Sequence, residues 1–130
     1  MSPMAWNLNS ERPIYSQIME RITFDIISGI YPPGSQLPSV RALAQDAGIN
    51  PNTMQKAMAE LERTGLIYSQ RTSGRFITED LGMIDKTKKD LASEEIREFL
   101  KKMERIGFTR ETTLELIENL KDTNNGEEEV

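Results

Sequence analysis

Apolar residues recur at helical spacing near the start of the chain. Four isoleucines follow one another at intervals of four residues: Ile14, Ile18, Ile22 and Ile26. This spacing places them on one face of an α-helix. Pro13 suits the first turn of that helix, where its missing N–H costs nothing. Gly29 and the Pro- and Gly-rich run 31–34 are typical of a helix end. The pattern therefore predicts one amphipathic helix between Pro13 and Gly29.

A second helix is predicted over residues 40–47, followed by a tight turn. Ser39 is a suitable N-cap for this helix, and Gly48 after it is suited to a left-handed turn conformation. Leu43 and Ala44 lie four or five residues before that glycine, at positions where two crossing helices pack closely. The pattern predicts the first half of a helix-turn-helix.

A third helix is predicted from the Asn50-Pro51 step to about Thr64, because Asn is a good N-cap and Pro suits the first helical position. An advance of ~100° per residue places one apolar set on one side: Met54, Ala57, Met58 and Leu61. It places a second set on the opposite side: Asn52, Gln55, Lys56, Ala59 and Arg63. Exposed amides and cations suit the donors and acceptors of a DNA major groove. The alternative is a merely solvated face.

A short β-hairpin is predicted after the third helix. Residues 66–70 read as one strand, 71–74 as the turn and 75–78 as the returning strand. Three helices followed by a hairpin predict a winged helix, so the fold class is mainly α with a small β-hairpin. Arg71 and Arg75 flank Ser73-Gly74, and a glycine at a hairpin tip lets backbone approach a phosphate or enter a minor groove. The alternative is an ordinary charged turn.

Two more helices are predicted after residue 78, where the composition becomes Lys- and Glu-rich. One ends before Gly107, and Thr109 can cap the last. Two helices can cover only part of their apolar faces, so self-pairing into a homodimer is expected; packing against their own winged helix is the alternative. The predicted dimer contacts are Ile96, Phe99, Leu100, Met103, Leu114 and Ile117.

The predicted organisation is a winged helix-turn-helix over 1–78, a dimerisation region over 79–121 and a disordered acidic tail over 122–130.

The charge of the chain is divided unevenly between these parts. The net charge is −5, which is unusual for a protein that binds DNA. Residues 1–78 carry seven cationic and six anionic side chains, a net charge of +1, whereas residues 79–130 carry nine and fifteen, a net charge of −6. The acidity therefore belongs to the C-terminal part and does not exclude DNA binding by the first.

The residue inventory argues against an enzyme and against a bound metal or cofactor. The 130-residue chain has neither histidine nor cysteine and no phosphate-cradling glycine loop. No catalytic residue, metal ligand or cofactor is predicted. Two short helices offer too little surface to enclose a drug-sized pocket, so a large effector is not expected. Because neither a signal peptide nor an apolar membrane span of ~20 residues is visible, the expected location is the cytoplasm.

Several motifs resemble the GntR family of regulators. They are Pro13-Ile14-Tyr15-Ser16-Gln17-Ile18; the run from Tyr31 to Arg41; Asn50-Pro51-Asn52-Thr53-Met54; Gly65-Leu66-Ile67; and Gly74-Arg75-Phe76-Ile77. With only about fifty further residues, the chain is similar to the short YtrA-like branch. This resemblance implies a small helical dimerisation region, a two-fold symmetric operator and frequent control of genes for membrane transporters. The function expected of the chain is that of a repressor that binds its operator as a homodimer.

The resemblance also implies roles for individual residues. Arg41 matches the family's base-reading arginine, Asn52 and Thr53 lie at the start of its recognition helix, and Gly74 matches its wing glycine. Pro51 and Thr72 depart from the family's pattern. The predicted DNA-binding residues are Ser39, Arg41, Asn50, Asn52, Thr53, Gln55, Lys56, Arg71, Ser73, Gly74 and Arg75. The partners expected are double-stranded DNA and a second copy of the chain; the alternative is a winged helix that contacts another protein.

Overall fold

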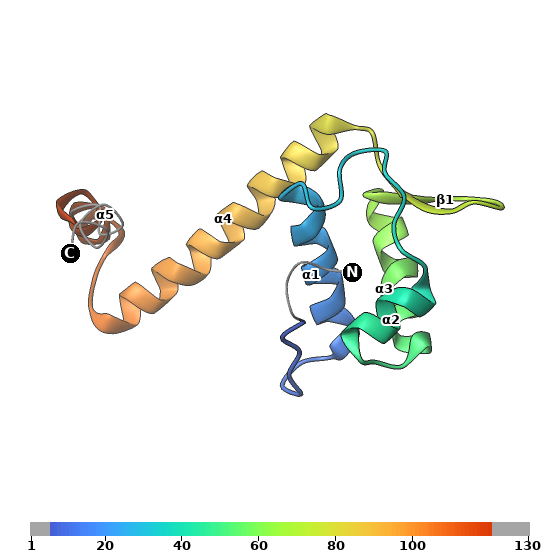
Figure 1. Cartoon of the computed structure of the whole chain (residues 1–130). Coiled ribbons are helices and arrows are strands. Elements are labelled where there is room, and N and C mark those ends of the chain that lie inside the picture. The colour runs from blue at the N-terminus through green and yellow to red at the C-terminus, as the bar shows by residue number, and fades with distance from the viewer. Residues whose placement is uncertain (1–5, 121–130) are drawn as a thin grey trace, which may run out of the picture. The chain divides into compact units, whose positions relative to one another are not determined.

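Five α-helices and one β-hairpin make up the part of the chain that the structure, a computed structural model, describes, residues 6–120 (Figure 1). The helices are α1 (Ile14–Ile27), α2 (Val40–Ala47), α3 (Pro51–Thr64), α4 (Leu81–Ile106) and α5 (Arg110–Asn119). The strands are β1 (Ile67–Gln70) and β2 (Gly74–Ile77), which pair antiparallel. This order confirms the predicted fold class, a winged helix-turn-helix followed by two helices. The predicted acidic tail, 122–130, lies outside the described residues.

The chain forms two compact units and passes from the first to the second between Lys88 and Lys89, inside α4. The predicted boundary lay earlier, at residue 79. The start of α4 belongs to the first unit because Met83 and Ile84 pack against its core. Asp80 precedes this helix and caps its start, since its Oδ1 accepts a hydrogen bond of 3.1 Å from the backbone N–H of Met83.

The core of the first unit joins the three N-terminal helices to the hairpin. Ile18, Ile22 and Ile26 of α1 are buried, as their spacing predicted, and they pack with an apolar set from the other elements. That set is Leu37, Leu43, Ala44, Met54, Ala57, Met58, Leu61, Leu66, Ile67 and Ile77. Pro13 occupies the N-cap position of α1 instead of a place within its first turn. The burial of one side of α3 fixes which of its side chains face outwards.

The helix-turn-helix formed by α2 and α3 has the caps that the sequence predicts. The Ser39 hydroxyl oxygen accepts a hydrogen bond from the backbone N–H of Ala42 at 3.0 Å, and Asn50 Oδ1 accepts one from the N–H of Asn52 at 2.7 Å. Gly48 ends α2 with a φ of 70°, a left-handed conformation that strains other residues. Gly48 and Asn50 thus form the turn from α2 to α3, while Ser39 caps the other end of α2.

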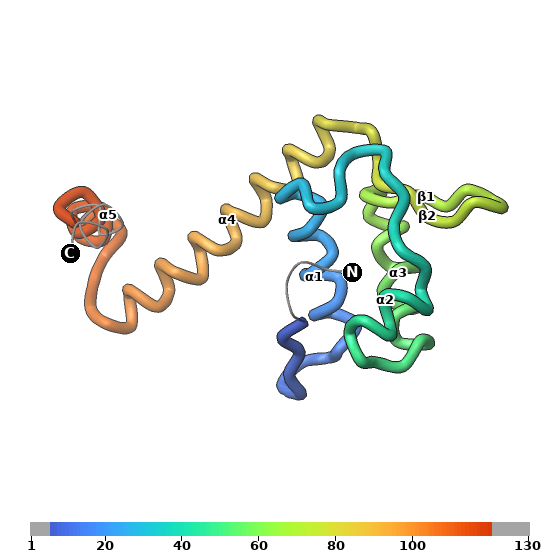
Figure 2. Tube along the Cα trace, in the orientation of Figure 1, coloured from blue at the N-terminus to red at the C-terminus, as the bar shows by residue number. Residues whose placement is uncertain are grey.

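The hairpin is joined along one edge by the loop between α1 and α2 (Figure 2). The backbone N–H of Leu37 donates to the carbonyl of Arg75 at 2.8 Å, and the N–H of Ile77 donates to the carbonyl of Ser35 at 2.8 Å. Gly74 is paired with Gln70 in the ladder, although the prediction placed this glycine in the turn. This pairing with Gln70 makes the strand begin one residue earlier than predicted.

The segment before α1 is held against the first unit by side-chain contacts. Gln17 accepts a hydrogen bond from the N–H of Asn9 at 3.0 Å and donates one to the carbonyl of Asn9 at 2.8 Å. The Trp6 indole N–H donates to Asp46 Oδ2 of α2 at 2.9 Å, and the guanidinium of Arg21 lies 4.6 Å from the centroid of the Trp6 ring. Trp6 therefore links α1 to the end of α2.

Candidate nucleic-acid interface

The outer side of α3 is a polar surface in the first unit. Asn52, Gln55 and Lys56 are exposed, as are Ala59 and Arg63, while Met54, Ala57, Met58 and Leu61 of the same helix are at most 1% exposed. Thr53 is half-buried. The two sides of the helix therefore fall where the sequence periodicity placed them, and the side that carries amides and cations is open to a partner.

Lys56 has a contact that the sequence did not predict. Its Nζ lies 4.2 Å from the centroid of the Tyr15 ring of α1. A cation over an aromatic face is held by about 0.5–1 kcal/mol at an exposed site. The ammonium group thus has a preferred place beside α3 while it stays exposed.

Three predicted site residues lie at the starts of α2 and α3. Arg41, the second residue of α2, is exposed. Ser39 and Asn50 both use their side-chain oxygens as helix caps. Since a hydroxyl and an amide group also carry donor hydrogens, capping leaves both residues able to donate a hydrogen bond to another molecule.

The end of the wing near Ser73 faces the segment that leads into α2. Arg71, Ser73 and Gly74 are exposed. A hollow of about 280 Å³ lies between this segment and the wing and is lined by residues 36–40 and 73–75. A Cβ on Gly74 would lie 3.0 Å from Nε2 of Gln36, and the φ of Gly74 is +109°. The wing backbone therefore requires glycine at this position.

Arg75 differs from the other predicted wing residues because it is paired within the protein. Its Nε donates a hydrogen bond to Glu62 Oε1 of α3 at 2.9 Å, and the hydroxyl of Ser69 donates to the same oxygen. Gln36 Nε2 donates to the carbonyl of Ser73 on the other side of the hairpin. Glu62, Ser69 and Gln36 were missed by the sequence analysis, because their roles depend on a register between distant segments.

The hydrogen bonds around Glu62 change its acidity. The hydrogen bond from Ser69 is the main cause that holds the pKa of the Glu62 carboxyl below its ordinary value, partial burial acts against it, and Arg75 lowers it further. Glu62 is therefore an anion at neutral pH, and its charge balances that of Arg75.

The second unit carries an apolar groove of about 460 Å³ between α4 and α5. Its lining residues are Ser93, Ile96, Arg97, Phe99, Leu100, Arg110, Thr113, Leu114 and Ile117. Among the predicted dimer contacts, Ile96, Phe99, Leu114 and Ile117 are 57%, 42%, 50% and 50% exposed. Leu100 is half-buried and lines the groove, whereas Met103 is half-buried and does not line it.

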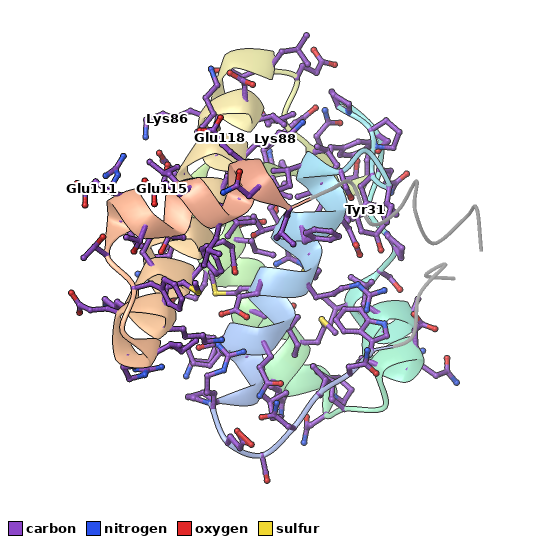
Figure 3. All side chains as sticks on the ribbon, turned by 90° about the vertical axis from the view of Figure 1, so that its left-hand side faces the viewer. Tyr31, Lys86, Lys88, Glu111, Glu115 and Glu118 are labelled. Carbon is purple, nitrogen blue, oxygen red and sulfur yellow. The ribbon has the colours of Figure 1, made fainter. Side chains whose placement is uncertain are left out.

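A different side of α5 is acidic. Glu111, Glu115 and Glu118 follow one another along the helix and are labelled in Figure 3. At ~100° per residue they lie on a different side from Thr113, Leu114 and Ile117. The second unit thus offers an apolar groove and an acidic side to its surroundings.

Other kinds of site are missing from the described part of the chain. Residues 6–120 contain no cluster of three or more His, Cys, Asp or Glu side chains placed to hold a metal ion. No helix within that range has both the length and the apolar character needed to cross a membrane.

Two curated relatives are similar to this chain. Residues 14–77 match the model of the bacterial regulatory proteins of the gntR family. The uncharacterized HTH-type transcriptional regulator YhcF of Bacillus subtilis (strain 168) is 39% identical over 108 residues, which cover 83% of this chain and 89% of YhcF. The HTH-type transcriptional repressor YtrA of the same strain is 46% identical over 71 residues, which cover 55% of each chain. The matched segment therefore spans about half of YtrA.

Solved structures show the same fold. A GntR family transcriptional regulator from Listeria monocytogenes superposes with a TM-score of 0.80 at 35% identity, covering 88% of this chain and 100% of that chain. The DNA-binding domain of AraR in complex with operator ORE1 superposes with a TM-score of 0.50 at 32% identity, covering 58% of this chain and 95% of that domain. The likeness thus includes a domain solved together with its operator.

Proposed function

The chain belongs to the GntR family of DNA-binding transcriptional regulators, and from that premise we propose that it is a repressor that binds a two-fold symmetric operator as a homodimer. The family makes it a regulator and not an enzyme, as the residue inventory predicted. The observation that carries the proposal is the exposed polar side of α3. Asn52, Gln55 and Lys56 are all open to solvent while the opposite side of the helix is buried.

In this proposal α3 lies in the major groove. The amide groups of Asn52 and Gln55 can read base edges, and Thr53 lies beside them at the start of the helix. Arg41 at the start of α2 reads a base or binds a phosphate, and Lys56 neutralises a phosphate. Ser39 and Asn50 contribute donor groups from the N-cap positions of α2 and α3.

The wing contacts the DNA beside the bases that α3 reads. Arg71 supplies an exposed cation, and the backbone at Ser73 and Gly74 approaches the duplex closely because no side chain projects from Gly74. The hollow between the wing and α2 is open to receive part of the DNA backbone.

A second copy of the chain is proposed to cover the groove of the second unit. An apolar surface of this kind is typical of an interface, and the exposed side chains of Phe99 and Leu114 are suited to fill the same groove on a partner. Arg110 at the groove and the acidic side of α5 offer opposite charges to such a copy. Helices from two chains can bury the apolar area that one chain leaves open, and so pair two DNA-binding units.

The biological role is proposed from the relatives. Repression is proposed because YtrA, 46% identical over the matched segment, is named a repressor; control of transporter genes is proposed from the YtrA-like resemblance. A regulator of this kind acts where the chromosome lies, so we propose the cytoplasm as its location. The proposal does not require a pocket for a large effector molecule.

Selection of bound sequences from random duplex DNA tests the proposal. The expected result is an inverted repeat whose half-sites lie about 34 Å, or one helical turn, apart. The logarithm of the affinity for this duplex should fall steeply with the logarithm of the salt concentration, by about 0.9 for each phosphate neutralised. Recovery of no shared sequence, with affinity insensitive to salt, would instead indicate a winged helix that contacts protein.

A further inference from the structure

The Glu62 carboxylate joins the recognition helix to both strands of the wing. Glu62 lies in the last turn of α3, Ser69 lies in β1 and Arg75 lies in β2. Ser69 and Arg75 are directly paired across the hairpin, so their side chains project from the same face. Both donate to Glu62 Oε1. This one oxygen atom of α3 therefore accepts hydrogen bonds from both strands of the wing.

This contact lies farther along the wing than the core. Ile67 and Ile77 form the buried pair at the root of the hairpin, and the Ser69–Arg75 pair lies two residues closer to the tip. The core holds the root of the hairpin, and the Glu62 contact holds the part that extends beyond it. The tip with Arg71 and Ser73 follows directly, so its place relative to α3 depends on the Glu62 contact.

The other edge of the wing is held independently. The backbone N–H of Leu37 in the loop donates to the carbonyl of Arg75, and the N–H of Ile77 in β2 donates to the carbonyl of Ser35 in the loop. Gln36 Nε2 also donates to the carbonyl of Ser73. These bonds fix the hairpin sideways against residues 34–37 but not towards α3. Glu62 supplies the contact in that second direction.

The charge of Arg75 is committed to this contact. The Arg75 side chain is 20% exposed and that of Glu62 is 31% exposed, and their charges cancel. Arg71, in the turn between β1 and β2, is exposed. Since counterion release upon DNA binding scales with the cations that neutralise phosphates, a cation that is already paired with a carboxylate adds little to it.

We propose that Glu62 is a positioning residue for the wing: through Ser69 and Arg75 it sets the angle at which the hairpin leaves α3, and Arg75 supports DNA binding through Glu62 and not by neutralising a phosphate. This inference rests on the proposed function, since the wing is taken to contact DNA. It replaces a direct DNA contact as the role of Arg75.

Two substitutions at Glu62 that remove the same charge test the inference. Glu62→Gln keeps an oxygen that can accept from Ser69 and Arg75, whereas Glu62→Ala removes it. Affinity for the duplex recovered by selection is expected to be at least about tenfold lower for Glu62→Ala than for Glu62→Gln, the size of a hydrogen bond to a charged group. Equal affinities, or tighter binding by Glu62→Ala because the guanidinium is released onto a phosphate, would overturn the proposal.

A charge-matched double variant tests the role of Arg75 separately and does not depend on Glu62→Ala folding. The Glu62→Gln/Arg75→Gln protein has the same net charge as the wild type. Its salt slope on the selected duplex is expected to equal that of the wild type. A slope smaller by about 0.9 for each Arg75 would show that Arg75 neutralises a phosphate and would contradict the inference.

Failure of the inference and failure of the proposed function give different results. If the wild-type protein selects no duplex, the proposed function fails, and the Glu62 contact is then judged by NMR hydrogen exchange at Arg75 Nε. Glu62→Ala is expected to accelerate that exchange and Glu62→Gln to leave it slow. Rapid exchange in the wild type would exclude the contact.

Discussion

Lys56 of α3 and Tyr15 of α1 are in cation–π contact, with the Lys56 Nζ 4.2 Å from the centroid of the Tyr15 ring. The ring holds the ammonium group beside the outer side of α3 before any DNA is bound. An anchored cation loses less freedom when it meets a phosphate. The two residues are far apart in the sequence but converge on the surface proposed to bind DNA.

Lys56→Gln should therefore weaken DNA binding in a salt-dependent way. The slope of log affinity against log salt is expected to fall by about 0.9 for each Lys56 that neutralises a phosphate. Lys102→Gln, which removes an equal charge from an exposed position in the second unit, is the matched control and should leave the slope nearly unchanged. The measurement is fluorescence anisotropy of the selected duplex over a series of salt concentrations. The same slope in Lys56→Gln and wild type would remove Lys56 from the interface.

Arg41→Ala should weaken specific binding by about 1–3 kcal/mol and relax base preference, if Arg41 reads a base edge. Arg41 is exposed at the start of α2, where its side chain is available to DNA. Arg105→Ala removes an exposed arginine from the second unit and serves as the control. The check is competition between the selected duplex and single-base variants of it. Unchanged discrimination by Arg41→Ala would refute its base-reading role.

Phe99→Glu should convert the proposed dimer into a monomer, because it places a charge in the apolar groove. Leu120→Glu makes the same change at a residue that is 66% exposed and does not line the groove; this variant should remain dimeric. Sedimentation velocity measures the oligomeric state of both variants. The Phe99→Glu monomer should retain a folded winged helix and lose tight binding to the inverted repeat. A dimer that persists in Phe99→Glu would exclude Phe99 from the interface.

The contribution of Glu62 to stability should depend on pH. Its pKa in the folded protein is lowered, chiefly by the hydrogen bond from Ser69. The folded state therefore binds fewer protons here than the unfolded state, whose Glu pKa is about 4.3. Its stabilising effect is fully present above that value and is lost as the pH falls through the lower folded pKa.

The free energy of unfolding in urea, measured for wild type and Glu62→Gln over a pH series, tests this dependence. The advantage of the wild type is expected to be constant from about pH 7 to pH 5 and to shrink below about pH 4. Because the other carboxyl groups are common to both proteins, the difference isolates Glu62. An advantage that grows as the pH falls would mean that the folded pKa is raised.

Local sequence patterns predicted the elements and the sidedness of α3. Ser39, Gly48 and Asn50 act within a few residues of themselves, so helix capping and turn conformation can be read directly from the sequence. The four-residue spacing of Ile18, Ile22 and Ile26 likewise identified the buried face of α1.

Contacts between distant segments were not predictable in this way. The Glu62–Arg75 and Lys56–Tyr15 contacts require the register of the hairpin and the packing of α3 on α1, which no local pattern specifies. The groove between α4 and α5 likewise depends on the packing of these two helices; Met103, one of the predicted dimer contacts, is half-buried and does not line it.

The most direct test of the account is to repeat the selection from random duplex DNA with Asn52→Ala/Gln55→Ala. Both side chains are exposed on α3 and carry no charge, so the fold and the salt slope should be retained. If this surface reads bases, preference should be lost at matching positions in both half-sites, while the spacing of the half-sites stays the same. Recovery of the wild-type sequence by this variant would contradict the claim that the outer side of α3 faces the bases.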